Sequence, residues 1–154
     1  MLLTVCKSSL IIIFITTLNI RYYFNSLRLL FIDISFFLAD ILVIIPNTLF
    51  WYKNIYTPSE LTYGEVSFYG IQKALNEIPK KCHHSFIDLG CGKGKILFFT
   101  RLIFKLDVTG VEINQNLTRL GRFLKTILYI KKTHFIHTDL GSIKLPDADI
   151  YFMA

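Results

Sequence analysis

Hydrophobic residues follow two different patterns along this chain, and the change falls near Trp51. Before it lie two long apolar stretches, Leu2–Ile20 and Leu29–Trp51, each interrupted by charged residues or proline. After it, short apolar runs of strand length alternate with stretches that repeat apolar residues at helical spacing. We therefore expect an apolar helical region over residues 1–52, a linker over 53–62 and an α/β domain over 63–154.

The second part alternates predicted strands with predicted helices. Helices are expected from Val66 to Ile78, ended by Pro79, over Ile96–Lys105, and after Asn114, which can cap its helix. Strands are expected at Ser85–Leu89, Val108–Glu112 and Thr133–Thr138, and a fourth strand begins at Asp149. This alternation predicts a doubly wound parallel sheet, which binds ligands at the carboxyl ends of its strands.

Three glycines at alternate positions follow the first of these strands. The strand ends in Asp88, and Gly90, Gly92 and Gly94 come next. Glycines allow a sharp turn and close approach to a ligand, while the helix that follows offers backbone N–H groups, so the segment suits an anionic or zwitterionic ligand. The spacing lacks the G-x-x-x-x-G-K-[ST] of a P-loop, and Lys95 occupies the place of the third glycine of a dinucleotide fingerprint.

A second acid ends the next predicted strand. Glu112 follows Gly90 by 22 residues, close to the roughly 20-residue offset at which an acid reaches a ribose hydroxyl in nucleotide-binding βαβ units. A carboxylate suits a ribose diol because it accepts two hydrogen bonds at once. The sequence therefore predicts a ligand that contains a ribose.

Together these motifs resemble the first motifs of class I S-adenosylmethionine (SAM) methyltransferases, which have a Rossmann-like fold. The resemblance implies that SAM is the cofactor and that Glu112 holds its ribose. It also implies that Asp139, just past the third strand, meets the amino group of adenine. Further cofactor contacts are expected from the strand end and the glycine loop: Asp88, Gly90, Cys91 (through its backbone), Gly92 and Gly94.

The segment before the sheet carries a second resemblance. Tyr63-Gly64-Glu65-Val66-Ser67-Phe68, with the glycine motif about 20 residues later, is similar to the corresponding segment of non-SET histone-lysine methyltransferases of the disruptor-of-telomeric-silencing type. It is also similar to that of bacterial membrane-linked class I methyltransferases. In those families this segment closes over the methionine end of SAM, a role that the resemblance implies for Tyr63 and Glu65. A protein lysine is then a possible methyl acceptor.

The resemblance covers roughly residues 58–154 and only the SAM-binding half of the family's seven-stranded sheet, since about four strands are present. The acceptor and the catalytic residues are therefore not identified, and we expect this chain to be incapable of turnover by itself. One alternative is a non-catalytic SAM-binding or membrane-interaction remnant. Another is a nucleotide-dependent oxidoreductase, which the missing third glycine disfavours.

The apolar region before Trp51 is close to the length that crosses a bilayer, yet it carries acids. Asp33 and Asp40 are seven residues apart and lie on one face of a helix. Two interpretations follow: a membrane-spanning hairpin with its polar face inward, or an amphipathic helix that lies on a membrane or on the α/β domain. We expect membrane association, with the SAM-binding domain on the cytoplasmic side.

Composition and charge exclude little. The formal net charge of +6 is spread along the chain, so it does not indicate nucleic-acid binding. The three cysteines, Cys6, Cys82 and Cys91, are scattered, which predicts neither disulfides nor zinc and fits a reducing compartment. His134 and His137 are three apart in a predicted strand and point to opposite faces, so we expect no metal site.

Overall fold

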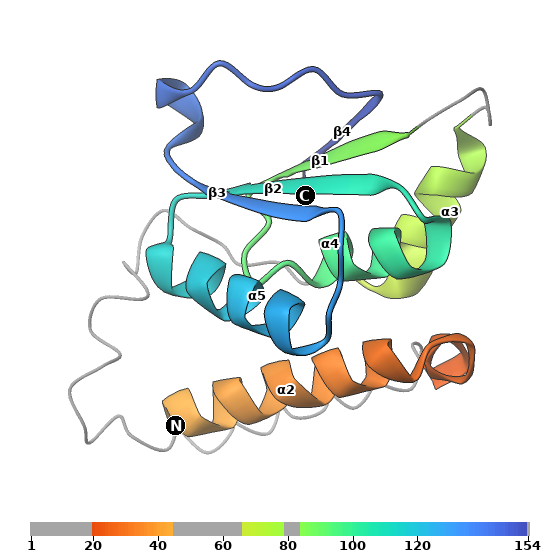
Figure 1. Cartoon of the computed structure of the whole chain (residues 1–154). Helices are drawn as coiled ribbons and strands as arrows, with labels where there is room; N and C mark the ends of the chain where they lie inside the picture. Colours follow the sequence, from red (N-terminus) through yellow and green to blue (C-terminus); the bar gives the residue numbers. More distant parts are fainter. Residues whose placement is uncertain (1–19, 45–65, 79–83, 154) are drawn as a thin grey trace, which may run out of the picture.

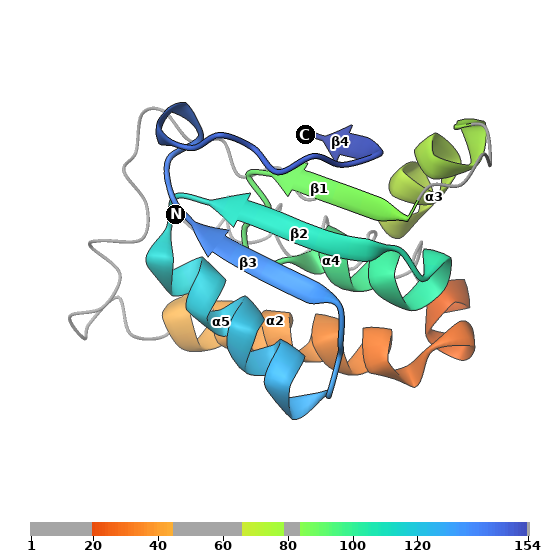
Figure 2. The same ribbon diagram turned by 45° about the horizontal axis from the view of Figure 1, so that its top comes forward.

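The apolar runs of the second part form one parallel sheet in the computed structural model, which describes residues 20–44, 66–78 and 84–153. The strands are β1 (Ser85–Leu89), β2 (Asp107–Glu112), β3 (Thr133–His137) and β4 (Ile150–Phe152). Their order is β3-β2-β1-β4, and every neighbouring pair is parallel (Figure 2). The predicted parallel sheet is confirmed, and its fourth strand lies beside the first.

The register of the sheet brings the carboxyl ends of three strands together. Asp88 of β1 pairs with Gly110 of β2, and Glu112 at the end of β2 pairs with His137 at the end of β3. Side chains and loops that follow β1, β2 and β3 therefore meet at one edge of the sheet, as expected for this fold.

Helices α3 (Phe68–Glu77), α4 (Lys95–Phe99) and α5 (Gln115–Ile127) lie on one side of the sheet (Figure 1). Ser67 caps α3 by accepting a hydrogen bond from the Gly70 N–H, and Asn114 caps α5 by accepting from the N–H groups of two following residues. Helix α4 continues as a π-helical turn, η2 (Thr100–Phe104), so the predicted helix over 96–105 is one element with a change of hydrogen-bond period.

Aromatic side chains fill the space between the sheet and these helices. The rings of Phe68 and Phe99 are stacked with centroids 4.6 Å apart, and Phe98 lies between Phe36 and Phe135 at centroid distances of 6.3 and 5.9 Å. Large fully buried rings contribute strongly to stability because each removes much apolar surface from water. This core anchors the helix that follows the glycine loop.

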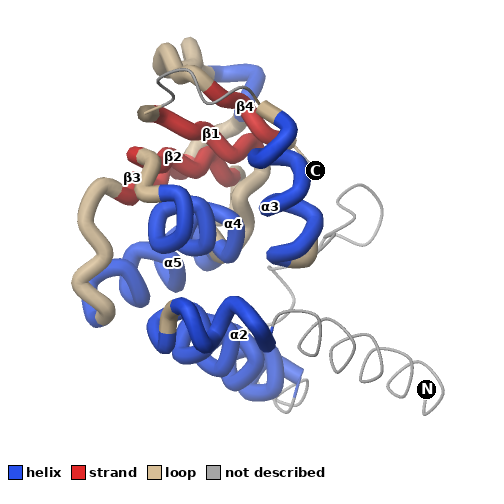
Figure 3. Tube along the Cα trace, turned by 90° about the vertical axis from the view of Figure 1, so that its right-hand side faces the viewer, coloured by secondary structure: helices blue, strands red, loops and turns tan. Residues whose placement is uncertain are grey.

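Helix α2 (Leu27–Ile44) adds a third layer on the outer side of the helices that cover the sheet (Figure 3). Leu29, Ile32 and Phe36 are buried on its inner face, and Tyr22 and Tyr23 from the preceding helical residues 20–25 are buried with them. These side chains belong to the same core cluster as Phe68 and Phe98. The part of the apolar region that the structure describes is thus packed on the α/β domain.

The two interpretations of the apolar region can now be compared with α2. Within residues 20–44, 66–78 and 84–153, no helix is long and apolar enough to cross a membrane. Asp33 faces protein rather than lipid, since it pairs with Lys95. The helix that lies on the α/β domain is the interpretation that α2 matches, and the predicted membrane-spanning helix finds no support in the described residues. The Asp40 side chain, the linker at 53–62 and the segments 1–19 and 45–52 lie outside them.

The opposite side of the sheet carries the chain between β3 and β4, which includes the short helix η3 (Leu140–Ser142) (Figure 1). The Tyr151 hydroxyl from β4 donates to the Pro146 carbonyl of this connection and accepts from the Ala148 N–H. Ile87 and Val111 are buried but lie apart from the main core cluster. The core that supports the glycine loop is therefore on the helical side alone.

Candidate cofactor-binding site

The glycine loop leaves β1 in a left-handed backbone conformation at all three glycines. The φ angles of Gly90, Gly92 and Gly94 are 86°, 54° and 88°, values that side-chain-bearing residues rarely adopt. The reasons for glycine differ between positions. A Cβ on Gly90 would meet nothing within 4 Å, whereas a Cβ on Gly94 would lie 2.5 Å from the Phe135 ring. Gly90 thus borders open space, while Gly94 allows close packing.

The backbone N–H groups of this loop bind protein acceptors. The Gly90 and Cys91 N–H groups donate to the Val111 carbonyl at 2.8 and 3.1 Å, and the Gly94 N–H donates to the Cys91 carbonyl at 2.9 Å. A phosphate cradle directs such N–H groups at its ligand. Here the cradle of free N–H groups expected from the glycine pattern is not formed at these positions. The loop offers a glycine surface, which suits a ligand without phosphate.

Glu112 holds the turn after β2 against the glycine loop. Its Oε2 accepts a hydrogen bond from the Gly92 N–H at 2.9 Å, and its Oε1 accepts from the Asn114 N–H at 2.8 Å. A carboxylate has about four acceptor sites, so each oxygen retains capacity for a second donor. Glu112 therefore has the geometry to accept from a ribose diol while it orders the loop.

Asp88 lies beneath the loop and is 4% exposed. Burial, and to a smaller extent the nearby Glu112 charge, together raise the pKa of its carboxyl group from 3.8 to about 7. The charged form of a buried acid near a second acid is unfavourable in the absence of a cation. The arrangement therefore favours a ligand with positive charge, such as one that carries a sulfonium and an ammonium group.

Asp139 follows β3 at the same edge of the sheet and is exposed. Its Oδ1 accepts from the Gly141 N–H at 3.1 Å, which caps η3. The adjacent Thr138 N–H donates to the Glu112 carbonyl at 3.1 Å, so the ends of β2 and β3 are joined. The structure thus brings Asp88, Glu112 and Asp139 to one edge, as the sequence predicts.

Cys91 differs from the other predicted cofactor residues. Its N–H binds Val111, and its side chain points toward Gly110, where an added Cβ would lie 2.4 Å from the sulfur. Burial, followed by the charges of Asp88 and Glu112, raises the pKa of the thiol. Cys91 is thus a packed, protonated thiol under the loop. The described residues contain no cluster of three or more His, Cys, Asp or Glu side chains that could hold a metal ion.

Four more residues bear on the site: two that the sequence predicts as cofactor contacts and two that form an unpredicted ion pair. Tyr63 and Glu65 lie outside the described residues, so their closing role stays a prediction. Asp33 of α2 forms an ion pair with Lys95 at the start of α4, a contact that sequence reasoning missed. Its only signal was an acid within an otherwise apolar helix.

Taken together, a parallel sheet with order β3-β2-β1-β4, a glycine turn after β1 and an acid at the end of β2 define the SAM-binding half of a class I methyltransferase. The profile of the family described as histone methylation protein DOT1 matches residues 41–147. The chain belongs to this family, whose members are SAM-dependent methyltransferases. No protein in the curated set of sequences matches this chain.

Three solved structures illustrate what this chain is similar to. PKMT2 from Rickettsia typhi, solved in complex with AdoHcy, is 19% identical with a TM-score of 0.41 and covers 46% of this chain and 14% of its own. A SAM-dependent methyltransferase from Aquifex aeolicus is 22% identical with a TM-score of 0.44, covering 53% and 46%. YjhP from E. coli is 20% identical with a TM-score of 0.45, covering 65% and 38%. The chain thus spans less than half of each of these proteins.

Proposed function

We propose that this protein takes part in SAM-dependent methyl transfer to a protein acceptor, with a lysine side chain as the acceptor group. The observation that carries the proposal is the pair of acids around the glycine loop, Asp88 and Glu112, within a chain of the DOT1 family. Both acids suit SAM, which has a ribose diol and two cationic groups and no phosphate.

Each predicted residue has a distinct part in this proposal. Glu112 accepts hydrogen bonds from the ribose, and Asp139 accepts from the adenine amino group. Gly90 lets the cofactor approach the backbone, since the space beside its Cα is open. Tyr63 and Glu65 are assigned to the methionine end by resemblance.

SAM, when bound, supplies a methyl group on a sulfonium, which is already a good leaving group. The protein's part is then to hold the cofactor so that an acceptor nitrogen lone pair lies in line with the methyl carbon. In such a transfer the N–C bond would form as the C–S bond breaks, S-adenosylhomocysteine would leave, and the methylated nitrogen would carry the positive charge of the sulfonium. A lysine acceptor must be deprotonated before it attacks, and the residue that takes this proton is not assigned.

Methyl transfer from labelled SAM to a lysine-rich protein mixture tests this function. We expect residues 1–154 to bind SAM without turnover, because the assigned residues all serve the cofactor and none provides an acceptor base. A longer relative from the same family should transfer label, and acetylation of its substrate lysines beforehand should abolish the transfer, because an amide nitrogen is not a nucleophile for the methyl group. A Gly92→Leu variant is the matched control for the cofactor site.

Label that survives blocking of lysines would contradict the lysine acceptor. Robust transfer by residues 1–154 would show that the described part of the chain is sufficient. Binding of SAM by both the chain and its longer relative, with no transfer by either, would favour the alternative of a non-catalytic SAM-binding protein. Preference for a nicotinamide cofactor over SAM would favour the oxidoreductase alternative.

We also propose that the protein associates with an anionic membrane surface on the cytoplasmic side. The outer face of α2 supports this, because exposed large apolar residues repeat there with spacings of three and four at Leu27, Phe31, Ile34 and Leu38, and Ile20 and Phe24 are exposed on the separate helical residues 20–25. Arg21 and Arg28 are exposed on the same stretch. A surface helix of this kind gains from apolar burial and from attraction to anionic lipids.

Flotation with vesicles of phosphatidylserine and phosphatidylcholine tests the membrane proposal. We expect wild-type protein to float, and a Phe24→Ser, Phe31→Ser variant to remain at the bottom of the gradient. Phe123→Ser is the matched control, since Phe123 is a similarly exposed ring on α5. Equal flotation of all three proteins, or none, would contradict the assignment of this face.

A further inference from the structure

Both lysines of the glycine loop are directed at helix α2. The Lys95 Nζ lies 3.3 Å from the Asp33 Oδ1, and the two side chains are only 12% and 13% exposed. The Lys93 Nζ lies 5.2 Å from the centroid of the Phe36 ring, and Lys93 is 4% exposed. Asp33 and Phe36 of α2 therefore contact the two lysines of the glycine loop.

The Asp33–Lys95 pair is itself surrounded by fixed groups. The Tyr23 hydroxyl donates to the Asp33 Oδ2, and the Lys95 Nζ lies 5.3 Å from the centroid of the Phe68 ring. A charge pair that is largely removed from water needs such partners, and the loss of one member leaves an uncompensated charge. The pair therefore couples α2 to the start of α4 more strongly than an exposed pair would.

The position of Lys95 makes this coupling relevant to the loop. Lys95 directly follows Gly94, whose φ of 88° forms the left-handed turn into α4. On the other side of the loop, the Gly92 N–H binds Glu112. The loop is therefore held between Glu112 at the sheet edge and Asp33 on α2. Asp33 lies before the 41–147 segment that matches the family profile.

We propose that α2 is a positioning element of the cofactor site, and that Asp33 orders the glycine loop through Lys95. The inference rests on the proposed function only in that the loop is taken as the SAM site. It assigns a role in cofactor binding to a helix for which the sequence pattern left open a membrane or the α/β domain as the partner.

Amide hydrogen exchange of the ligand-free protein tests the inference without any cofactor. In an Asp33→Asn variant, we expect the Gly92 and Gly94 N–H groups to exchange about tenfold faster, because local opening of the loop becomes easier. The Lys95→Arg variant keeps the charge and should retain nearly wild-type rates. The Val108 and Thr138 N–H groups of the sheet serve as internal references in each protein.

Asp107→Asn is the matched control variant. Asp107 forms ion pairs with Lys132 and Arg101 at the other end of β2, so its loss removes the same chemical group without touching the loop. We expect unchanged exchange at Gly92 and Gly94 in this control. Equal rates at these glycines in wild-type and Asp33→Asn proteins would overturn the inference.

Binding of S-adenosylhomocysteine, measured by calorimetry, separates this inference from the proposed function. We expect Asp33→Asn to weaken binding about tenfold, and Asp33→Asn with Lys95→Met to recover part of the loss because both members of the buried pair are then neutral. Should Asp33→Asn fail to fold, the exchange rates of the double variant are compared with those of Lys95→Met alone. We expect the Gly92 and Gly94 N–H groups to exchange faster in Lys95→Met than in the double variant.

The outcomes are distinguishable. Wild-type protein that fails to bind S-adenosylhomocysteine would contradict the proposed site but leave the exchange result as the test of α2. Wild-type binding that Glu112→Gln weakens and Asp33→Asn does not would support the site and overturn the role of α2.

Discussion

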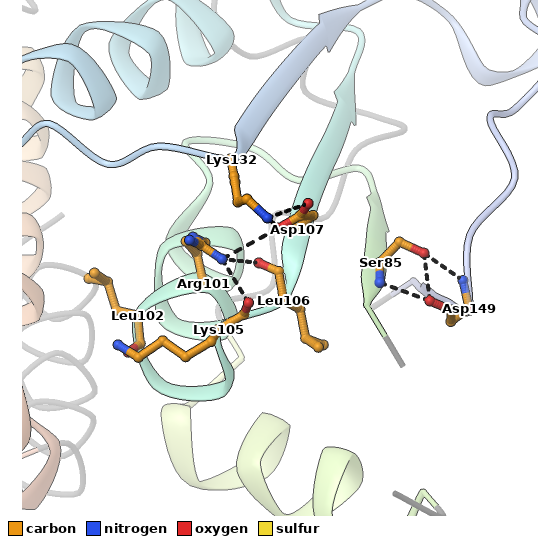
Figure 4. A network of polar contacts seen from close by, with 8 residues as sticks. All are labelled: Ser85, Arg101, Leu102, Lys105, Leu106, Asp107, Lys132 and Asp149. Carbon is orange, nitrogen blue, oxygen red and sulfur yellow. Dashed lines mark hydrogen bonds and ion pairs between the residues drawn. The ribbon is translucent and has the colours of Figure 1, made fainter. Parts of the chain in front are cut away.

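The two ends of the same parallel sheet both carry acids, but the protein surrounds them differently. At the amino ends, Asp107 is paired with Arg101 and Lys132, and Asp149 accepts hydrogen bonds from the Ser85 hydroxyl and N–H (Figure 4). At the carboxyl ends, Asp88 lies buried beside a second acid, Glu112. The amino-end acids thus have partners that stabilise their charge, whereas the Asp88 charge is disfavoured.

The acids at the amino ends therefore stabilise the fold, whereas Asp88 at the carboxyl ends is suited to a ligand. A buried acid beside another acid lowers the stability of the fold at neutral pH, and a cationic ligand would relieve that cost. Arrangements that oppose stability are expected where a site is adapted for binding. The comparison therefore favours the carboxyl ends as the place for a ligand, on grounds other than the glycine motif.

Removal of the Asp88 charge should have the largest effect on stability, and the effect should depend on pH. The pKa of Asp88 is raised from 3.8 to about 7 in the folded protein. Between these values the unfolded chain has lost the proton and the folded protein keeps it, so the free energy of unfolding falls as the pH rises. The loss is on the order of 4 kcal/mol in total.

Urea unfolding of wild-type and Asp88→Asn proteins from pH 4 to pH 8 measures this effect. We expect the free energy of unfolding of Asp88→Asn to fall less than that of the wild type as the pH rises. The variant should be the more stable protein at pH 8. Because other groups titrate in the same range, the difference between the two proteins is the quantity to compare. A constant difference across the range would contradict the raised pKa of Asp88.

A pair of glycine variants should separate packing from backbone conformation at the carboxyl edge. Gly94→Ala places a Cβ 2.5 Å from the Phe135 ring at a φ of +88°, while Gly90→Ala meets nothing within 4 Å at a φ of +86°. We expect losses of about 3 kcal/mol and about 1 kcal/mol, respectively. Thermal unfolding measures both, and equal losses would show that packing against Phe135 is not the reason for Gly94.

The N-cap of α5 should contribute less to the free energy of unfolding than Gly94 does. The Asn114 side chain accepts from the N–H groups of Asn116 and Leu117 at 2.9 and 3.4 Å. Asn114→Ala should lower the free energy of unfolding by about 1 kcal/mol, whereas Asn114→Asp, which keeps the acceptor, should lower it much less. Identical stability of these two variants in urea unfolding would argue against the cap.

Asp107, at the amino end of β2, should contribute least to the free energy of unfolding. Asp107 is 48% exposed in its side chain and Lys132 is 60% exposed, so solvent screens their attraction. Asp107→Asn is expected to cost less than about 1 kcal/mol, and less still in 0.5 M salt. A loss as large as that of Gly94→Ala would mean that the amino end is as critical for stability as the carboxyl end.

The elements of the sheet were predictable because their signals are local. Ser85–Leu89 is a short segment with three apolar residues, Phe86, Ile87 and Leu89, and glycine follows it directly. Asn114 is a capping residue directly before a helical repeat. The meeting of Asp88, Glu112 and Asp139 was predictable as well, since parallel strands bring their carboxyl ends together. The roles of these residues toward SAM stay predictions.

The contribution of α2 was not predictable because it depends on contacts between distant parts of the chain. Nothing in the sequence near Asp33 indicates that its partner is Lys95, and a mostly apolar helix with two acids is compatible with lipid or with protein. The hydrogen-bond acceptors of the loop N–H groups were likewise not predictable from the sequence. The same glycine spacing fits a loop that directs them at a ligand and one that directs them at Val111.

Titration of SAM into wild-type, Glu112→Gln and Asp107→Asn proteins, followed by calorimetry, tests the central claim most directly. The claim is that the carboxyl ends of β1 and β2 bind SAM. We predict that Glu112→Gln weakens binding by roughly 1.5–3 kcal/mol, as expected for a charged acceptor of hydrogen bonds, and that Asp107→Asn leaves the affinity unchanged. Equal affinity of all three proteins for SAM, or a loss confined to Asp107→Asn, would contradict the claim.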